Sequence, residues 1–244
     1  MRLPLAAALT GAISAQVPAQ AHAQALSCAV PREVPRPSPD LPDDRQPVRR
    51  LPIGSYTLAI SWSPEYCRTA RDRAASRFQC GGGSRFGFTL HGLWPDGVGK
   101  EWPQYCRPTA ILPRATIRRN LCATPSAQLL QHEWAKHGTC MAGSTADRYF
   151  ARSTAMYRAL RFPDMDALSR RPALTVGALA EEVARANPGM RASMMRVTTT
   201  RQGWLDEIWL CADTRFRYRA CPAHQGGAAS SERLRIWRGP DGPR

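Results

Sequence analysis

The chain has very little lysine. Of its 34 basic side chains, 32 are arginine, and Lys100 and Lys136 are the two lysines. Acidic side chains are also scarce, since 19 Asp and Glu leave a formal net charge of +15 at pH 7. Such a basic protein attracts polyanions, nucleic acids among them, although scattered arginine is also an ordinary solvated surface. Where nearly every cation is arginine, Lys136 indicates a need for a compact point charge.

Further absences narrow the class of protein. The uncharged apolar run at residues 3–12 is shorter than the ~20 residues that cross a bilayer. The eight cysteines include no Cys-x-x-Cys pair, which argues against a metal cluster. The sequence also shows no internal repeat and no acidic cluster suited to a metal ion. We therefore expect neither a membrane span nor a cofactor.

The N-terminal residues predict secretion. Arg2 precedes the apolar run, and small residues follow it, with possible cleavage sites after Ala23 or Ala25. We predict a signal peptide at residues 1–23, a secreted or periplasmic protein, and no membrane attachment after cleavage. Residues 24–53 contain seven prolines, which forbid a helix and most sheet pairing. They predict an extended, partly disordered leader.

The remaining residues, 54–244, suit one globular domain. An alternating, β-rich segment at 56–62 predicts a central strand, and Ser63-Pro64 should break it. Residues 97–125 contain four prolines and are expected to be irregular. Helices between strands of an antiparallel sheet predict an α+β fold with helices packed around the sheet. The other expected strands are 85–90, 193–198, 203–212, 215–221 and 233–237, and the expected helices are 126–138 (capped by Ser126), 147–161 and 175–186.

Eight cysteines after a secretion signal predict four disulfides and no free thiol. Cys211 and Cys221 flank a plausible hairpin, and a Cys67–Cys80 bond would close a short loop. The pairing of the other four stays open at this point: Cys28, Cys106, Cys122 and Cys140.

Residues 132–140, His-Glu-Trp-Ala-Lys-His-Gly-Thr-Cys, concentrate groups for proton and charge chemistry. In a helix, Glu133 and His137 share a face, and His132 and Lys136 form the neighbouring row. The two histidines are five residues apart, about 140° around an α-helix, so they should not grip one metal ion. This spacing argues against the His-Glu-x-x-His motif of zinc proteases. Gly138 is expected to end the helix in a left-handed cap.

Residues 88–96, Phe-Thr-Leu-His-Gly-Leu-Trp-Pro-Asp, form the second notable stretch. A strand should end at His91, with Gly92 turning the chain and Pro95 stopping regular structure. Beside Trp94 and Asp96, His91 is typical of a site that stacks a planar ring and hydrogen-bonds its edge.

Residues 91–95 and 132–140, in this order and separation, resemble the two active-site segments of the ribonuclease T2 family. The resemblance runs from about Tyr56 to about Trp237. It implies a secreted, disulfide-stapled α+β ribonuclease that cleaves single-stranded RNA with little base preference. It also implies a bond between Cys140 and a cysteine between the two segments, which favours Cys106–Cys140 and leaves Cys28–Cys122. A Cys122–Cys140 bond is the alternative.

The resemblance also implies roles for the five side chains. His91, Glu133 and His137 would be catalytic, with His137 the base and His91 the acid, and His132 and Lys136 would hold the phosphate. This inventory suits RNA, whose 2′-hydroxyl lies beside each phosphate: histidines with an ordinary pKa of ~6.5 can accept and donate protons. A carboxyl group and an ammonium group can stabilise the growing charge on the phosphate. No metal or cofactor is required.

Three residues are candidates for holding the base 5′ to the cut: Trp94, Asp96 and Trp102. Stacking tolerates every base, which fits low specificity. A core position is the alternative for Trp102, and His224 is expected at the surface. We expect a monomer that binds single-stranded RNA. The alternatives are a non-catalytic, basic RNA- or polyanion-binding protein on the same fold and, against the spacing argument, a zinc hydrolase.

Overall fold

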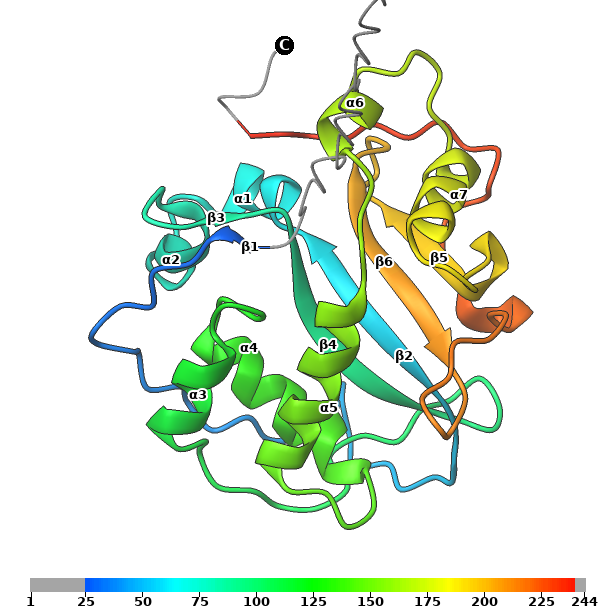
Figure 1. Ribbon diagram of the computed structural model, residues 1–244. Helices are drawn as coiled ribbons and strands as arrows, with labels where there is room; N and C mark the ends of the chain where they lie inside the picture. Colours follow the sequence, from blue (N-terminus) through cyan, green and yellow to red (C-terminus); the bar gives the residue numbers. More distant parts are fainter. Residues whose placement is uncertain (1–24, 240–244) are drawn as a thin grey trace, which may run out of the picture.

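A four-stranded antiparallel sheet in the order β4-β2-β6-β5 organises the molecule (Figure 1). The computed structural model describes residues 25–239, so the signal peptide predicted at 1–23 lies outside the described residues. The strands are β2 Ile53–Trp62, β4 Phe88–Gly97, β5 Met195–Thr199 and β6 Leu205–Ala212. A small second sheet pairs β1 Ala25–Ser27 with β3 Arg85–Phe86. The expected central position of residues 56–62 and the α+β class are confirmed.

Helices surround the sheet. They are α1 Ser63–Ala70, α2 Arg77–Cys80, α3 Arg114–Asn120, α4 Ala127–His132, α5 Ala146–Ala159, α6 Met165–Ser169 and α7 Val176–Ala186. Single turns of 3-10 helix are η1 Ala74–Ser76, η3 Gly138–Cys140, η4 Ala192–Met194 and η5 Ala223–Gln225. Hydroxyl side chains cap α4, α5 and α7, as Ser126 does by accepting from the backbone N–H of Leu129. No helix within residues 25–239 is long and apolar enough to span a membrane.

The two faces of the sheet differ in chemistry. Leu58, Ile60 and Ile208 are fully buried in the core, where α5 contacts β2 and β4 (Figure 1). Because strand side chains alternate, the intervening residues of β2 and β6 face the opposite side. Polar and aromatic residues are among them, and two of these, Ser61 and Glu207, lie opposite each other in the register. The second face is where the candidate site is built.

Several expected elements differ from the structure. Residues 97–125 are not wholly irregular, because α3 begins directly after Pro113. The short helix α6 was also not predicted from the sequence. The strands expected at 215–221 and 233–237 are wrong: these segments make isolated bridges at Tyr218, Arg233 and Arg235. At the first of them, Asp213 accepts from the backbone N–H groups of Arg215 and Arg217, which turns the chain locally.

The leader is extended, as its prolines require, but the expectation of partial disorder is wrong for the described residues 25–52. Cys28 is bonded to Cys122, and Val34 is buried against the core. The Arg118 guanidinium donates to the carbonyl of Pro31, which gives the leader backbone a partner without sheet pairing. The leader therefore forms part of the folded domain.

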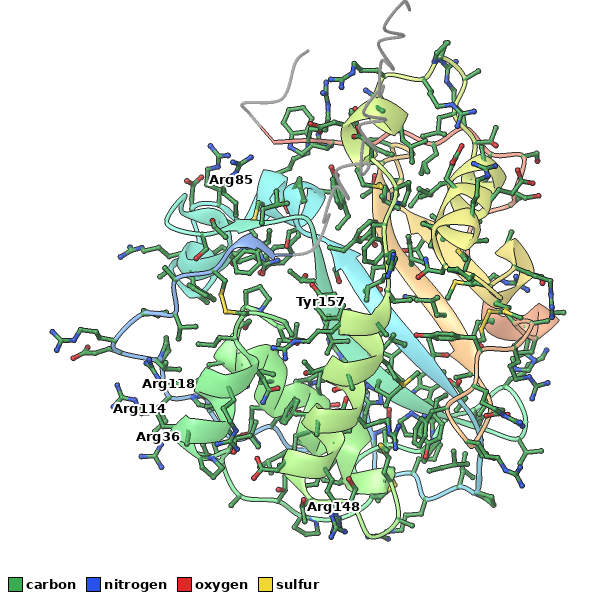
Figure 2. All side chains as sticks on the ribbon, viewed as in Figure 1. Arg36, Arg85, Arg114, Arg118, Arg148 and Tyr157 are labelled. Carbon is green, nitrogen blue, oxygen red and sulfur yellow. A yellow bond between two sulfur atoms is a disulfide. The ribbon has the colours of Figure 1, made fainter. Side chains whose placement is uncertain are left out.

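The four disulfides are Cys28–Cys122, Cys67–Cys80, Cys106–Cys140 and Cys211–Cys221, and the described residues contain no free cysteine (Figure 2). These are the expected pairs. Cys140 is bonded to Cys106, so the alternative Cys122–Cys140 bond is wrong. Each closed loop restricts the unfolded chain and contributes about 2–4 kcal/mol.

Candidate active site

His91 lies in a bulge of the edge strand β4, and not at a strand end as expected. The register moves from Ala59–Gly92 to Ile60–Leu90, which leaves His91 as the extra residue. Bulges redirect a side chain at such positions. The strand continues through Pro95 because its missing N–H costs nothing on the outer side of an edge strand.

Gly92 permits a close approach and does not turn the chain. A Cβ atom there would lie 1.7 Å from Oε2 of Glu133, so a larger residue would displace that carboxyl group. Gly138 is also required by contact, since its Cβ would lie 2.4 Å from the Trp134 ring. Its φ of −64° is right-handed, so the expected left-handed cap is wrong.

The second segment is a π-helix, η2 Glu133–His137, inserted between α4 and η3. The backbone N–H of Gly138 donates to the carbonyl of Glu133, five residues earlier. Such a turn is wider than an α-helical one and brings residues five apart towards the same face. The rings of His132 and His137 are therefore 6.2 Å apart, and the expectation that they point about 140° apart in an α-helix is wrong.

This geometry also overturns the spacing argument against a metal ion. His132, Glu133 and His137 each offer a ligand atom, and these atoms lie within 4.8 Å of one another. Two features oppose a cation there. The Nδ1 of His132 is already bonded to Asp40, and the ammonium group of Lys136 adds positive charge to the same turn.

Glu133 is the buried centre of the site. Its Oε2 accepts from Trp94 Nε1 at 2.9 Å, and its Oε1 lies 3.5 Å from Nε2 of His91. Burial raises the pKa of this carboxyl group, against the opposing effects of His91, His132 and Lys136. Its Oε1 is buried and has no hydrogen-bond partner among the described residues.

His91 is held by a carboxylate that the sequence did not indicate. Its Nδ1–H donates to Oε1 of Glu207 at 2.6 Å, and Ser61 and Trp209 also donate to Glu207. Burial lowers the pKa of His91, but the hydrogen bond to Glu207 and the charge of Glu133 outweigh it and raise the pKa to about 9. Burial raises the pKa of Glu207, but its partners outweigh that effect and lower it to about 2.

His137 has the opposite environment. It is 5% exposed and packs against Trp94, with ring centroids 5.6 Å apart. Burial and then the positive charges of Lys136, His132 and His91 lower its pKa well below the ordinary value. Its Nδ1 has no hydrogen-bond partner among the described residues. His137 is therefore neutral at pH 7, whereas His91 is protonated.

The leader also reaches this site. The Nδ1–H of His132 donates to Oδ2 of Asp40 at 3.0 Å, and the hydroxyl group of Tyr105 donates to the other oxygen at 2.7 Å. Asp40 accepts both bonds, so it fixes the ring of His132. Burial lowers the pKa of the neighbouring Lys136, with Glu133 and Asp40 opposing that change.

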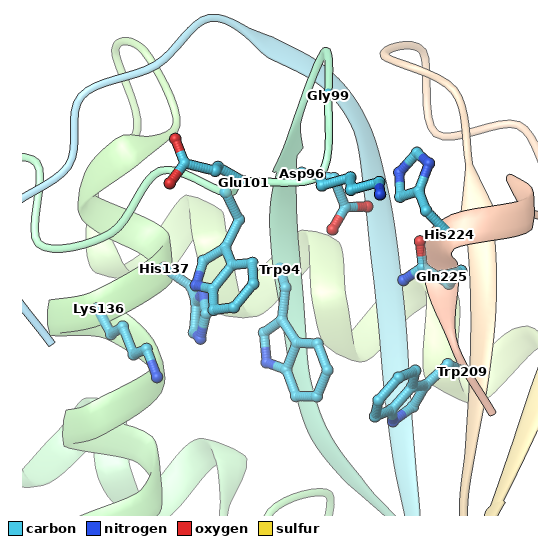
Figure 3. A pocket seen from close by; sticks show the side chains of 11 residues that line it. Trp94, Asp96, Gly99, Glu101, Lys136, His137, Trp209, His224 and Gln225 are labelled. Carbon is cyan, nitrogen blue, oxygen red and sulfur yellow. The ribbon is translucent and has the colours of Figure 1, made fainter. Parts of the chain in front are cut away.

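A cavity of about 300 Å³ opens beside these side chains (Figure 3). Trp94, Trp102, Trp209 and Asp96 line it together with Lys136 and His137. Trp102 is 43% exposed, so the alternative of a core position is wrong.

The rim of this cavity includes η5, which carries His224 and Gln225. His224 is exposed as expected, but it lies on the rim beside Asp96 (Figure 3). Gln225 donates to Thr57, whose hydroxyl group donates to Asp96 at 2.9 Å. Burial raises the pKa of Asp96, and its hydrogen bonds to Thr57 and Ser55 oppose that effect.

Comparison with known proteins identifies the family of the chain. Residues 53–221 match the model of the Ribonuclease T2 family. A probable ribonuclease of Haemophilus influenzae is 30% identical over 183 residues, which cover 70% of this chain and 62% of that protein. A ribonuclease of Aeromonas hydrophila is 40% identical over 92 residues, covering 38% and 40% of the two chains. The chain thus spans less than two thirds of the length of these relatives.

The fold is shared with solved structures. Trichomaglin, described as an S-like ribonuclease, superimposes with a TM-score of 0.60 at 20% identity, over 76% of this chain and 98% of its own. The family match covers both segments that carry the candidate site, and the sequence resemblance is thereby confirmed. The chain belongs to the ribonuclease T2 family.

Proposed function

We propose that the protein is a secreted or periplasmic, monomeric endoribonuclease. It cleaves single-stranded RNA by attack of the 2′-hydroxyl on the adjacent phosphate and needs no metal ion. One observation carries this proposal: His91 and His137 have pKa values shifted in opposite directions, and both contact Trp94. Two titratable groups with separated pKa values supply an acid and a base at the same pH.

The neutral His137 takes the proton of the 2′-hydroxyl, and the oxygen then attacks phosphorus. The bond from phosphorus to the 5′ oxygen breaks, and the protonated His91 gives that oxygen its proton. The products are a 2′,3′-cyclic phosphate and a free 5′-hydroxyl. The opposite directions of the two pKa shifts favour this assignment over its reverse, since His91 begins charged and His137 begins neutral.

Three groups would stabilise the phosphate. Lys136 supplies positive charge, His132 offers its Nε2 to a phosphate oxygen, and the raised pKa of Glu133 lets it hold a proton and donate a hydrogen bond. Glu207 and Asp40 act as positioning residues: each accepts from the Nδ1–H of a histidine and leaves its Nε2 for the substrate.

The tryptophan-lined cavity would hold the base 5′ to the cut. Trp94 and Trp102 offer faces for stacking, and Asp96 offers a carboxyl group to the edge of the base. The matched family and the basic composition favour RNA over other polyanions.

The test is degradation of polymeric RNA in excess EDTA, with mass analysis of the first products. We expect full activity and 2′,3′-cyclic phosphate ends. Binding without cleavage would support a non-catalytic RNA-binding protein instead. Loss of activity in EDTA that zinc restores would support a zinc hydrolase built on His132, Glu133 and His137.

A further inference from the structure

The helix α6, the start of β6 and the last described residues lie near one another at one end of the sheet (Figure 1). The residues of these segments line a second cleft. Its volume is about 750 Å³, and no acidic side chain occurs among the described residues that line it. Five arginines line it: Arg170, Arg171, Arg233, Arg235 and Arg238. We call it the arginine cleft.

Much of this positive charge is not neutralised within the protein. Arg171 pairs with Glu182 at 2.9 Å. Among residues 25–239, however, Arg170, Arg233 and Arg235 form no direct ion pair with a carboxylate, although the charge of Arg235 acts at longer range on the carboxyl group of Glu65. Guanidinium groups concentrated in a concave surface create a strong positive potential, which favours a polyanion.

Aromatic rings hold some of these groups in place. The guanidinium carbon of Arg235 lies 3.7 Å from the ring centroid of Trp204. Arg68 lies 4.9 Å from the same ring and 5.3 Å from that of Trp237, and it is bonded to Glu65. Stacking uses the face of a guanidinium group and leaves its N–H edge for phosphate oxygens. The arginine at 235 is therefore oriented before any ligand binds.

The register of the sheet places the cleft relative to the candidate active site. Trp94 of the base cavity lies opposite Thr57 of β2, and Glu207 lies opposite Ser61, four residues further along β2. Trp204 precedes Glu207 by three residues, roughly 10 Å along a strand. Along the sheet, the tryptophan-lined cavity therefore comes first, then Glu207, which holds His91, and then the arginine cleft.

We propose that the arginine cleft binds the phosphate backbone of RNA on the 3′ side of the cut. This inference rests on the proposed function, in which the base 5′ to the cut occupies the tryptophan cavity. His91 protonates the 5′ oxygen of the following nucleotide, and it lies opposite the Ala59–Ile60 step of β2, which is further towards the cleft than Trp94 opposite Thr57. The following nucleotide is therefore on the cleft side of the bound base. A strand that continues in the same direction reaches Arg233 and Arg235.

The test uses DNA strands that contain one cleavable ribonucleotide. In one substrate the DNA arm extends on the 3′ side, in the second on the 5′ side, and the third is a dinucleotide without an arm. The variant Arg233→Gln/Arg235→Gln should raise KM for the 3′-arm substrate roughly tenfold, because charged hydrogen bonds are removed. KM for the other two substrates should not change. The slope of log(kcat/KM) against log[salt] is negative, and it should become less negative by about 0.7 for each phosphate that the variant no longer neutralises.

Two further variants are compared with Arg233→Gln/Arg235→Gln. Arg36→Gln/Arg148→Gln removes the same charge from arginines far from the cleft (Figure 2). Arg170→Gln removes a cleft arginine that does not stack on Trp204, so it tests the charge without disturbing the stack.

Three results would overturn the proposal: an equal rise in KM for the 3′-arm and 5′-arm substrates, a rise in KM for the dinucleotide, or no rise in KM for any substrate. If anionic lipid vesicles lose affinity for the cleft variant while the 3′-arm KM is unchanged, the cleft serves a membrane surface instead. Failure of the proposed function is seen separately, as absence of a cyclic phosphate when the unaltered enzyme acts on the dinucleotide.

Discussion

Replacement of Glu207 by Gln tests how His91 is kept protonated. Glu207 transfers no proton in the proposed reaction, but its carboxylate accepts a hydrogen bond from the Nδ1–H of His91 at 2.6 Å. Because that bond and its charge raise the pKa of His91 to about 9, their removal should lower this pKa by ~1–2 units. Glu133 remains beside the ring and keeps part of the shift. The basic limb of the pH–rate profile should therefore move to lower pH.

The size of the effect depends on pH. With a pKa of about 9, roughly three quarters of His91 is protonated at pH 8.5; with a pKa of ~7.5, roughly a tenth is. The Gln variant should therefore lose about eightfold more kcat/KM at pH 8.5 than at pH 6, where His91 is protonated in both proteins.

The assay is cleavage of a dinucleotide across this pH range at constant ionic strength. Asp147→Asn is the control, since it removes a carboxylate from an exposed ion pair with Arg119. A loss in the Gln variant that is the same at every pH would show that Glu207 merely supports the fold, and the reasoning would fail.

The same pair makes a stability prediction with a defined sign. The pKa of His91 is raised, so its contribution is complete below ~6.5 and is lost as pH rises to about 9. The pKa of Glu207 is lowered, so its contribution is complete above ~4.5 and is lost as pH falls to about 2. The difference in unfolding free energy between the native protein and Glu207→Gln, measured by denaturant titration, should be largest between these limits.

The remaining predictions concern other parts of the site and the disulfides. His91→Ala and His137→Ala should each abolish nearly all cleavage while the far-ultraviolet circular dichroism is kept, and the double variant should be no worse than either, because the two act as a unit; substantial turnover in either would refute the assignment. Asp40→Ala should raise KM for a dinucleotide about tenfold through removal of the charged bond to His132, whereas Asp44→Ala on the same leader should not; equal effects would refute a positioning role. Thiol titration of the denatured, non-reduced protein should find no free thiol, and two or more would contradict the four bonds.

Local sequence patterns predicted much of the fold. Residues 56–62 alternate clearly enough to show a central strand, and Ser126 marked the start of α4 as its N-cap. Pro95 misled, because proline is excluded from a central strand but allowed on an edge, and only the sheet order shows which strand is at the edge. The α3 helix was hidden among prolines, although Pro113 directly precedes its first turn.

The candidate site was predicted where its residues are close in sequence. Its long-range parts were not, since Glu207 is 116 residues from His91, and Asp40 is 92 residues from His132. Nothing in a single sequence marks these carboxylates as partners of those rings. The π-helical turn was missed for another reason: an i→i+5 bond has no distinct residue pattern, so the five-residue spacing was interpreted with α-helical geometry.

In the proposed mechanism the 2′-hydroxyl of RNA is the nucleophile, and every other role in the site depends on it. The most direct test is a strand with a single 2′-deoxy or 2′-O-methyl nucleotide. We expect the bond 3′ to that nucleotide to resist cleavage, the neighbouring bonds to be cut, and each first product to end in a 2′,3′-cyclic phosphate. Cleavage at the blocked bond, or a 5′-phosphate on the downstream fragment, would show that water attacks instead and would contradict the mechanism.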